Sequence, residues 1–103
     1  MATAKPGGIL KSGDTIEANG DYFIDPVNGY SLTMQNTFGG GTITILPGTQ
    51  KLSATSVTAS GTEAAGYTAD FNIYLQGPMK INLSGATAPS IQVIIDTVYT
   101  RIR

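Results

Sequence analysis

Apolar residues in this chain alternate with polar ones at a period of two, the spacing of a β-strand with one buried face. The alternation is clearest at 30–34, 71–75 and 79–83, where every second residue is large and apolar. No window shows the i, i+3, i+4, i+7 spacing of an amphipathic helix. At most one helical turn is expected, at 62–65, because Gly61 and Gly66 bracket it.

Turn residues divide the chain into short segments. The expected strands are 9–11, 15–18, 21–24, 30–34, 42–46, a polar edge strand at 51–60, 71–75, 79–83 and 91–102. Asn19-Gly20 predicts a hairpin between the second and third of these. Short strands at even spacing are typical of sandwiches and barrels. We therefore expect an all-β fold: a single small β-sandwich (jelly-roll-like) or a small barrel, with eight or nine short strands and essentially no helix.

A chain of 103 residues is one domain. Residues 1–8 are small or polar and end in Pro6-Gly7-Gly8, so we expect an N-terminal arm, with the single β-sandwich domain at 9–103. Such an arm is ordered either by a neighbouring molecule, which we prefer, or by its own sandwich. In the core we expect Ile81, Leu83, Ile91 and Val93, which follow the period of two.

The last expected strand, 91–102, changes its apolar parity. Ile91, Val93 and Ile95 share one face, whereas Val98 and Ile102 share the other. A β-bulge near 95–97 would bring both sets to the core. Alternatively, the core covers one face and a neighbouring subunit covers the other. The second possibility predicts a homo-oligomer, with a trimer as first choice.

Composition argues against an enzyme. The chain has no His, Cys or Trp, and only its 6 basic and 7 acidic residues are charged. No His base is present to activate a Ser or Thr. A net charge of −1 without clustered cations predicts no nucleic-acid binding. We expect no disulfide, signal peptide or membrane span, since the longest apolar cluster, 93–95, is too short.

Several residue groups are weighed as sites, and each has a simpler structural explanation. Gly39–Gly41 could cradle phosphate, but they precede a strand and no Lys follows. Asp21, Asp25 and Asn28 could bind Ca²⁺, but Asp and Asn are also common turn residues. The remaining candidates are Glu17, Glu63, Asp70 and Asp96 as a glycosidase pair, Tyr67 as a loop contact residue, and Tyr22, Tyr30, Tyr74 and Tyr99 as half-buried strand residues. We predict no catalytic residue, no metal site and no cofactor.

The segment 71–95 carries a resemblance. The strand 71–75 is followed by Lys80-Ile81-Asn82 and by the loop Ser84-Gly85-Ala86-Thr87-Ala88-Pro89-Ser90. This order resembles small all-β structural proteins of tailed bacteriophages, with a looser similarity over 15–46 and a departure at 51–67. The resemblance implies a virion protein that is made in the host cytoplasm. A head decoration or cement protein that contacts the major capsid or other virion proteins is the first choice, and a tail or neck subunit is the second. Exposed tyrosines leave a carbohydrate- or surface-binding module as the alternative.

Overall fold

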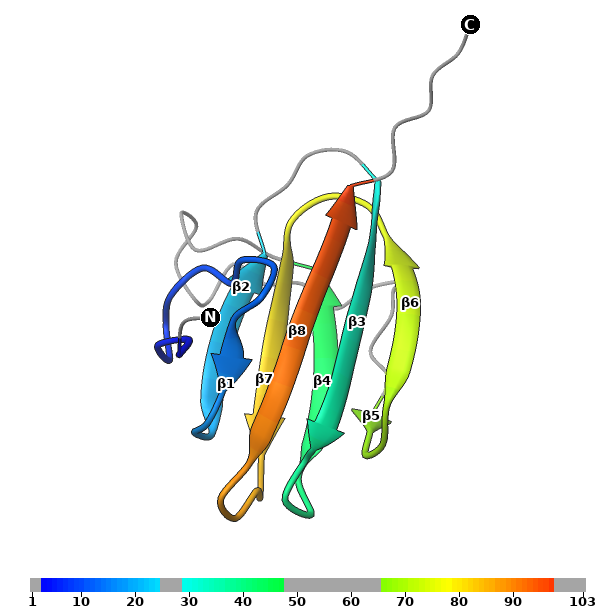
Figure 1. The fold of residues 1–103 in the computed structure, drawn as a ribbon. Helices are drawn as coiled ribbons and strands as arrows, with labels where there is room; N and C mark the ends of the chain where they lie inside the picture. Colours follow the sequence, from blue (N-terminus) through cyan, green and yellow to red (C-terminus); the bar gives the residue numbers. More distant parts are fainter. Residues whose placement is uncertain (1–2, 25–28, 48–65, 98–103) are drawn as a thin grey trace, which may run out of the picture.

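Two antiparallel sheets pack face to face in a computed structural model of the chain, which describes residues 3–24, 29–47 and 66–97 (Figure 1). The strands are β1 (Thr15–Ile16), β2 (Gly20–Ile24), β3 (Tyr30–Thr37), β4 (Thr42–Pro47), β5 (Gly66–Tyr67), β6 (Phe71–Leu75), β7 (Met79–Ser84) and β8 (Ser90–Thr97). The expected edge strand at 51–60 and the helical turn at 62–65 lie outside the described residues.

The strand order is that of a jelly roll. One sheet has the order β1-β8-β3-β6 and the other β2-β7-β4-β5. Hydrogen bonds join β1 to β8, β2 to β7, β3 to β6 and β4 to β5. The first strand thus pairs with the last, the second with the last but one, and so on inward. A long hairpin with this nesting, wound into two layers, is a jelly-roll sandwich. The prediction of an all-β sandwich is confirmed.

The predicted hairpin at Asn19-Gly20 is wrong. The strands on either side of it, β1 and β2, lie in different sheets. The dipeptide turns the corner from one layer to the other, and Gly20 has φ of 144°, in the region that favours glycine. Tyr22 closes this corner, because its hydroxyl donates a hydrogen bond to the Ala18 carbonyl (2.6 Å). Local turn chemistry identified the bend, but the partner of each strand is far away in the sequence.

The ladder between β3 and β8 runs without interruption from the pair Tyr30–Thr97 to the pair Thr37–Ser90. A bulge at 95–97 is therefore absent from the described part of β8, and that prediction is wrong there. Ile91 and Val93 are fully buried, and Ile95 packs partly against the core. Residues 98–102, which carry the opposite parity, lie outside the described residues, so coverage by a neighbouring subunit stays a prediction.

The core lies between the two sheets and consists of apolar side chains and two tyrosines. The four predicted core residues, Ile81, Leu83, Ile91 and Val93, are all at most 1% exposed, which confirms the prediction. Among the described residues, the hydroxyl groups of the two tyrosines are the only polar side-chain groups that enter the core, and no charged side chain is buried. Full burial of each aliphatic side chain stabilises the fold by about 1.5–3 kcal/mol, so these layers hold the sheets together.

The N-terminal segment lies along its own sandwich. The Ala4 amide donates to the Thr15 carbonyl (2.8 Å), at the edge of β1. Further on, the Gly7 amide donates to the Asp21 carbonyl (2.6 Å) and the Phe23 amide to the Gly8 carbonyl (3.0 Å), at the edge of β2. The segment therefore covers the same-side edges of both sheets. Residues 3–8 thus bond to their own sandwich, the alternative that we preferred less, while ordering of residues 1–8 by a neighbouring molecule stays a prediction and residues 1–2 lie outside the described ranges. The expected strand at 9–11 is reduced to a single bridge from Ile9 to Phe23.

The core assignment predicts the effect of a charge at Ile81. Its neighbours across the sheet are Tyr22 and Ile45, and it is fully buried. Ile81→Asp places an unpaired carboxylate there, which costs at least about 3 kcal/mol. We expect urea denaturation to show an unfolded or severely weakened protein. The control Thr44→Asp, on the outer side of the same sheet, should unfold near the wild-type midpoint. Equal midpoints for both variants would contradict the assignment.

The covered edges predict the effect of deleting residues 2–8. Removing this segment breaks the three backbone hydrogen bonds above. It also exposes the part of the core on which Ala4 packs. At about 1 kcal/mol per bond, the free energy of unfolding should fall by about 2–4 kcal/mol. Calorimetry should show a lower melting temperature. An unchanged melting temperature would mean that the segment contributes nothing to its own fold.

Candidate interaction surface

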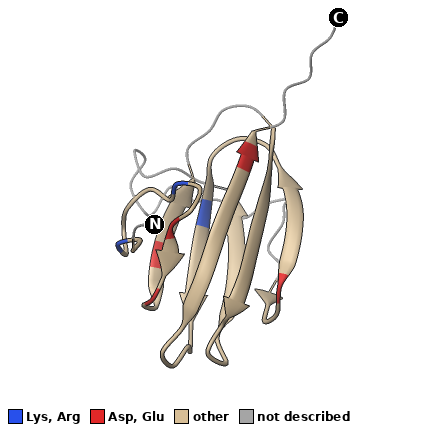
Figure 2. Cartoon of the chain, viewed as in Figure 1, with Lys and Arg blue, Asp and Glu red and all other residues tan. Residues whose placement is uncertain are grey.

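The four carboxylates considered as a catalytic pair do not meet in the described part of the structure. Asp96 stands opposite Ser31, whereas Asp70 precedes Phe71, which stands opposite Met34. At about 3.4 Å per residue, this places Asp70 and Asp96 more than about 10 Å apart along the sheet. Glu17 lies exposed beyond β1, and Glu63 lies outside the described residues. Asp70 and Asp96 therefore stand apart, and Figure 2 shows the acidic position at the end of β8 well separated from the one beside β6.

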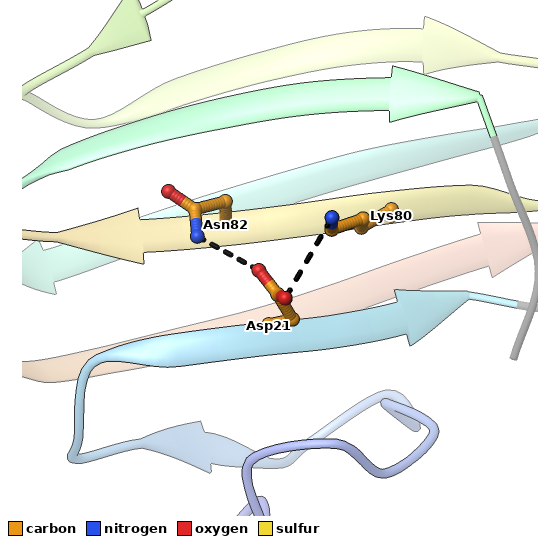
Figure 3. A network of polar contacts seen from close by, with 3 residues as sticks. All are labelled: Asp21, Lys80 and Asn82. Carbon is orange, nitrogen blue, oxygen red and sulfur yellow. Dashed lines mark hydrogen bonds and ion pairs between the residues drawn. The ribbon is translucent and has the colours of Figure 1, made fainter. Parts of the chain in front are cut away.

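Asp21, the described member of the possible Ca²⁺ group, already has partners (Figure 3). The Asn82 side-chain amide donates to its Oδ1 (2.8 Å), and the Lys80 Nζ lies 3.6 Å from its Oδ2. The lysine ammonium thus occupies the place beside the carboxylate that a cation would take. The described ranges contain no cluster of three or more metal-ligating side chains. Asp25 and Asn28 lie outside them.

The glycine run at 39–41 makes a close approach between two loops. Gly39 and Gly40 have φ of 66° and 76°, and a Cβ at Gly41 would lie 2.7 Å from that of Ala86. The Thr87 amide donates to the Gly39 carbonyl (2.8 Å). These glycines are required by the packing of the β3–β4 loop on the β7–β8 loop. That packing supports the structural interpretation of the run.

Asn19 joins a third loop to this end of the sandwich. Its side-chain amide donates to the Ala86 carbonyl (3.0 Å), and its Oδ1 accepts from the Ala86 amide (2.9 Å). The Asn19 side chain thereby makes the two hydrogen bonds to the Ala86 backbone that a neighbouring strand would otherwise make. Similarly, Asp70 accepts from the Asn36 amide (3.1 Å) and ties the β5–β6 loop to the end of β3. The lower end of the sandwich in Figure 1 is held by these short, linked loops.

The tyrosines differ from the half-buried pattern expected for them. Tyr22 and Tyr30 are fully buried, and the Tyr30 hydroxyl donates to the Gly77 carbonyl (3.0 Å). Tyr67 lies in β5 rather than in a loop and stacks on Phe71, with ring centroids 4.0 Å apart. Tyr74 is 56% exposed, so the prominent aromatic of the described surface is not the one that the sequence suggested. Tyr99 lies outside the described residues.

Tyr74 belongs to an outward surface of β3, β6 and β8 that we call the polar face. Its members alternate with the buried residues of these strands and are Ser31, Thr33, Gln35, Asn72, Tyr74, Gln92, Ile94 and Asp96. Cross-strand hydrogen bonds order it: Gln35 donates to Gln92 (2.9 Å), and Asn72 donates to Thr33 Oγ1 (2.6 Å). Asp96 is the one charged member of this set. Side chains that cross-strand hydrogen bonds already hold in place lose less rotamer freedom when a protein surface covers them, and a nearly uncharged face avoids most of the large cost of desolvating charges.

Comparison with known proteins finds no matching family model, no matching curated protein and no matching solved structure. Across the residues that the structure describes, no helix has the length and apolarity to cross a membrane.

The buried tyrosines predict a loss of stability at alkaline pH. Burial raises the pKa of Tyr30 well above its ordinary value, and it also raises that of Tyr22 despite the opposing hydrogen bond to Ala18. Below a pH of about 10, both phenols are protonated in the folded chain and in the unfolded chain. The free energy of unfolding therefore does not depend on their ionisation in that range. Above it, the unfolded chain alone loses these protons, and the free energy of unfolding should fall by up to about 1.4 kcal/mol per pH unit for each residue.

Urea denaturation across this range, with phenolate absorbance as a second signal, checks the expectation. The Tyr22→Phe and Tyr30→Phe variants lose a hydrogen bond each but should show a shallower alkaline slope. Wild-type phenols that all ionise near pH 10 while the protein stays folded would contradict it.

Proposed function

We propose that this protein is a non-enzymatic virion structural protein of a tailed bacteriophage, a head decoration or cement protein. The observation that carries the proposal is the polar face, an ordered and nearly uncharged surface on a rigid sandwich. Such a surface suits broad protein contact better than capture of a small ligand. The resemblance of 71–95 to phage structural proteins points the same way. Jelly rolls also occur in viral capsid proteins, which is support by analogy.

In the proposed mechanism, many identical weak contacts together stabilise the shell. A single contact through the polar face is weak, since four of its eight side chains are already paired with one another and it carries only one charge. A symmetric shell presents the same contact many times, and an oligomer that spans neighbouring shell subunits engages several at once. Multivalent binding then resists the outward pressure on the shell. A tail or neck subunit would use the same surface in the same way.

The rigidity of the body supports this role. The linked loops at one end and the covered edges of β1 and β2 leave a scaffold whose contact surface is set by strand pairing. Asp70, Asp96 and Asp21 each stand apart from one another or are already paired, so none of them is arranged for acid–base chemistry with another.

Tyr74 supports one alternative function. Its ring is exposed beside Asn72 and Ser31 on the polar face. An aromatic ring flanked by amide and hydroxyl groups is the combination that binds sugars. A carbohydrate- or surface-binding module therefore remains the second candidate.

The proposal predicts that the protein is a stoichiometric component of phage particles. Particles purified from the source of the sequence should contain it by mass spectrometry. Particles that lack the gene should release DNA at a lower temperature, and adding the purified protein back should restore the wild-type temperature.

Absence from purified particles would contradict the proposal. Binding to a glycan array that is lost in Tyr74→Ala, with wild-type binding in the outer-face control Thr44→Ala, would favour the carbohydrate module instead.

A further inference from the structure

The edge strand β6 has a free side in the described structure. Its sheet has the order β1-β8-β3-β6, and the opposite edge, β1, bonds to the N-terminal segment. β6 itself bonds to β3 alone among the described strands. Its sequence, Phe-Asn-Ile-Tyr-Leu, carries neither charge nor proline, two features that protect natural edges from pairing.

Hydrogen bonds elsewhere in the sheet establish which groups of β6 point outward. Val93 of β8 faces away from β3, because its amide donates to the Asp14 carbonyl (2.9 Å) and its carbonyl accepts from Gly13 (2.8 Å). Even-numbered residues of β8 therefore bond to β3, and they do so at odd-numbered β3 residues. The even-numbered residues of β3 then bond to β6, and the Asn36 amide, which donates to Asp70 on that side, agrees.

The same alternation continues into β6. Phe71, Ile73 and Leu75 stand opposite even-numbered β3 residues and use their amides and carbonyls in that ladder. Asn72 and Tyr74 direct their backbone amides and carbonyls away from β3. No described residue bonds to these groups. The free edge thus offers two donors and two acceptors, centred on Ile73.

We propose that β6 pairs with β6 of a second copy of this chain, antiparallel, about a two-fold axis at Ile73. In this register Asn72 stands opposite Tyr74 of the second copy, and Tyr74 opposite its Asn72. Both are pairs that exchange two backbone hydrogen bonds, so all outward donors and acceptors find partners. The strand is complementary to itself. This proposal deepens the proposed function, since it names how that oligomer forms.

Charge favours the antiparallel register over a parallel one. Asp70, next to β6, stands opposite the uncharged Gln76 of the second copy, and the two Asp70 carboxylates lie about 20 Å apart. A parallel pair would bring these carboxylates together. The antiparallel arrangement therefore avoids repulsion between like charges at the joint.

Apolar contacts add to the joint. Phe71 and Ile73 face the core but are only partly buried, whereas Leu32 and Met34, their neighbours on β3, are fully buried. A strand added beyond β6 covers the exposed remainder, with Ile73 against Ile73 at the axis and Phe71 near Leu75. The two polar faces then form one continuous surface across the axis.

The symmetry determines the size of the assembly. In the β1-β8-β3-β6 sheet, the N-terminal segment occupies the β1 side, so β6 is the one free edge of this sheet among the described strands. Pairing of two copies of β6 about a two-fold axis uses this edge in both molecules and leaves none of this sheet for growth. The joint gives a closed dimer, rather than the trimer expected from the sequence, or a dimeric unit within a larger symmetric assembly.

A charge exchange on the polar face tests the register. The variant Asn72→Lys/Tyr74→Lys places lysine opposite lysine twice, whereas Asn72→Lys/Tyr74→Glu places lysine opposite glutamate twice. Both variants lose the same wild-type side chains, including the bond from Asn72 to Thr33, so they form a matched pair. Sedimentation and native mass spectrometry measure self-association, and circular dichroism verifies the fold.

We expect a wild-type dimer, at least about tenfold weaker self-association in the lysine–lysine variant, and recovery in the lysine–glutamate variant. Mixing the lysine–lysine protein with Asn72→Glu/Tyr74→Glu should produce the mixed dimer. A monomeric wild type, or an oligomer that the lysine–lysine variant leaves unchanged, would overturn the proposal. If the protein forms the β6 dimer but is absent from phage particles, only the proposed function is refuted. If it is a particle component but the charge variants do not change its self-association, only the β6 pairing is refuted.

Discussion

The ladder between β8 and β3 is the contact on which the rest of the structure depends. It joins residues 30–37 to residues 90–97, and β8 also holds β1 and the 13–14 turn on its other side. The first and last described strands therefore become neighbours, and every other pair of the nested hairpin lies inside them. Pairing across such distances in the sequence costs loop entropy before the sheets can pack, so the apolar residues of both layers must compensate for it.

Tyrosine and asparagine side chains hold the places where the chain leaves one sheet for another. Tyr22 bonds to the β1–β2 corner, Tyr30 bonds to the β6–β7 turn, and Asn19 bonds across to the β7–β8 loop. Each uses a polar tip to bind a backbone group that no strand partner satisfies. A domain of this size buries only a small core, so these hydrogen bonds help to define a single arrangement of its loops.

The surfaces of the sandwich are unlike one another. The edges of β1 and β2 are covered by the chain's own beginning, while the outward backbone groups of β6 have no partner among the described residues and Tyr74 presents an exposed ring. The polar face between them carries one charge, Asp96, among its defined members. This asymmetry is the feature of the sandwich on which the proposed structural role rests.

The sequence by itself determined the all-β class, the positions of most strands and the inward residues Ile81, Leu83, Ile91 and Val93, because burial on one face of a strand leaves a period of two in the chain. It also marked the bend at Asn19-Gly20 as a turn.

Only the tertiary structure decided which strands pair. It turned that bend into a corner between sheets, placed residues 3–8 on their own sandwich, and buried Tyr22 and Tyr30 while exposing Tyr74. The physical reason is that a strand's pattern records whether a side chain is covered, but not by what. Its partners, and the edge that has none among the described strands, follow from how the chain winds into two layers.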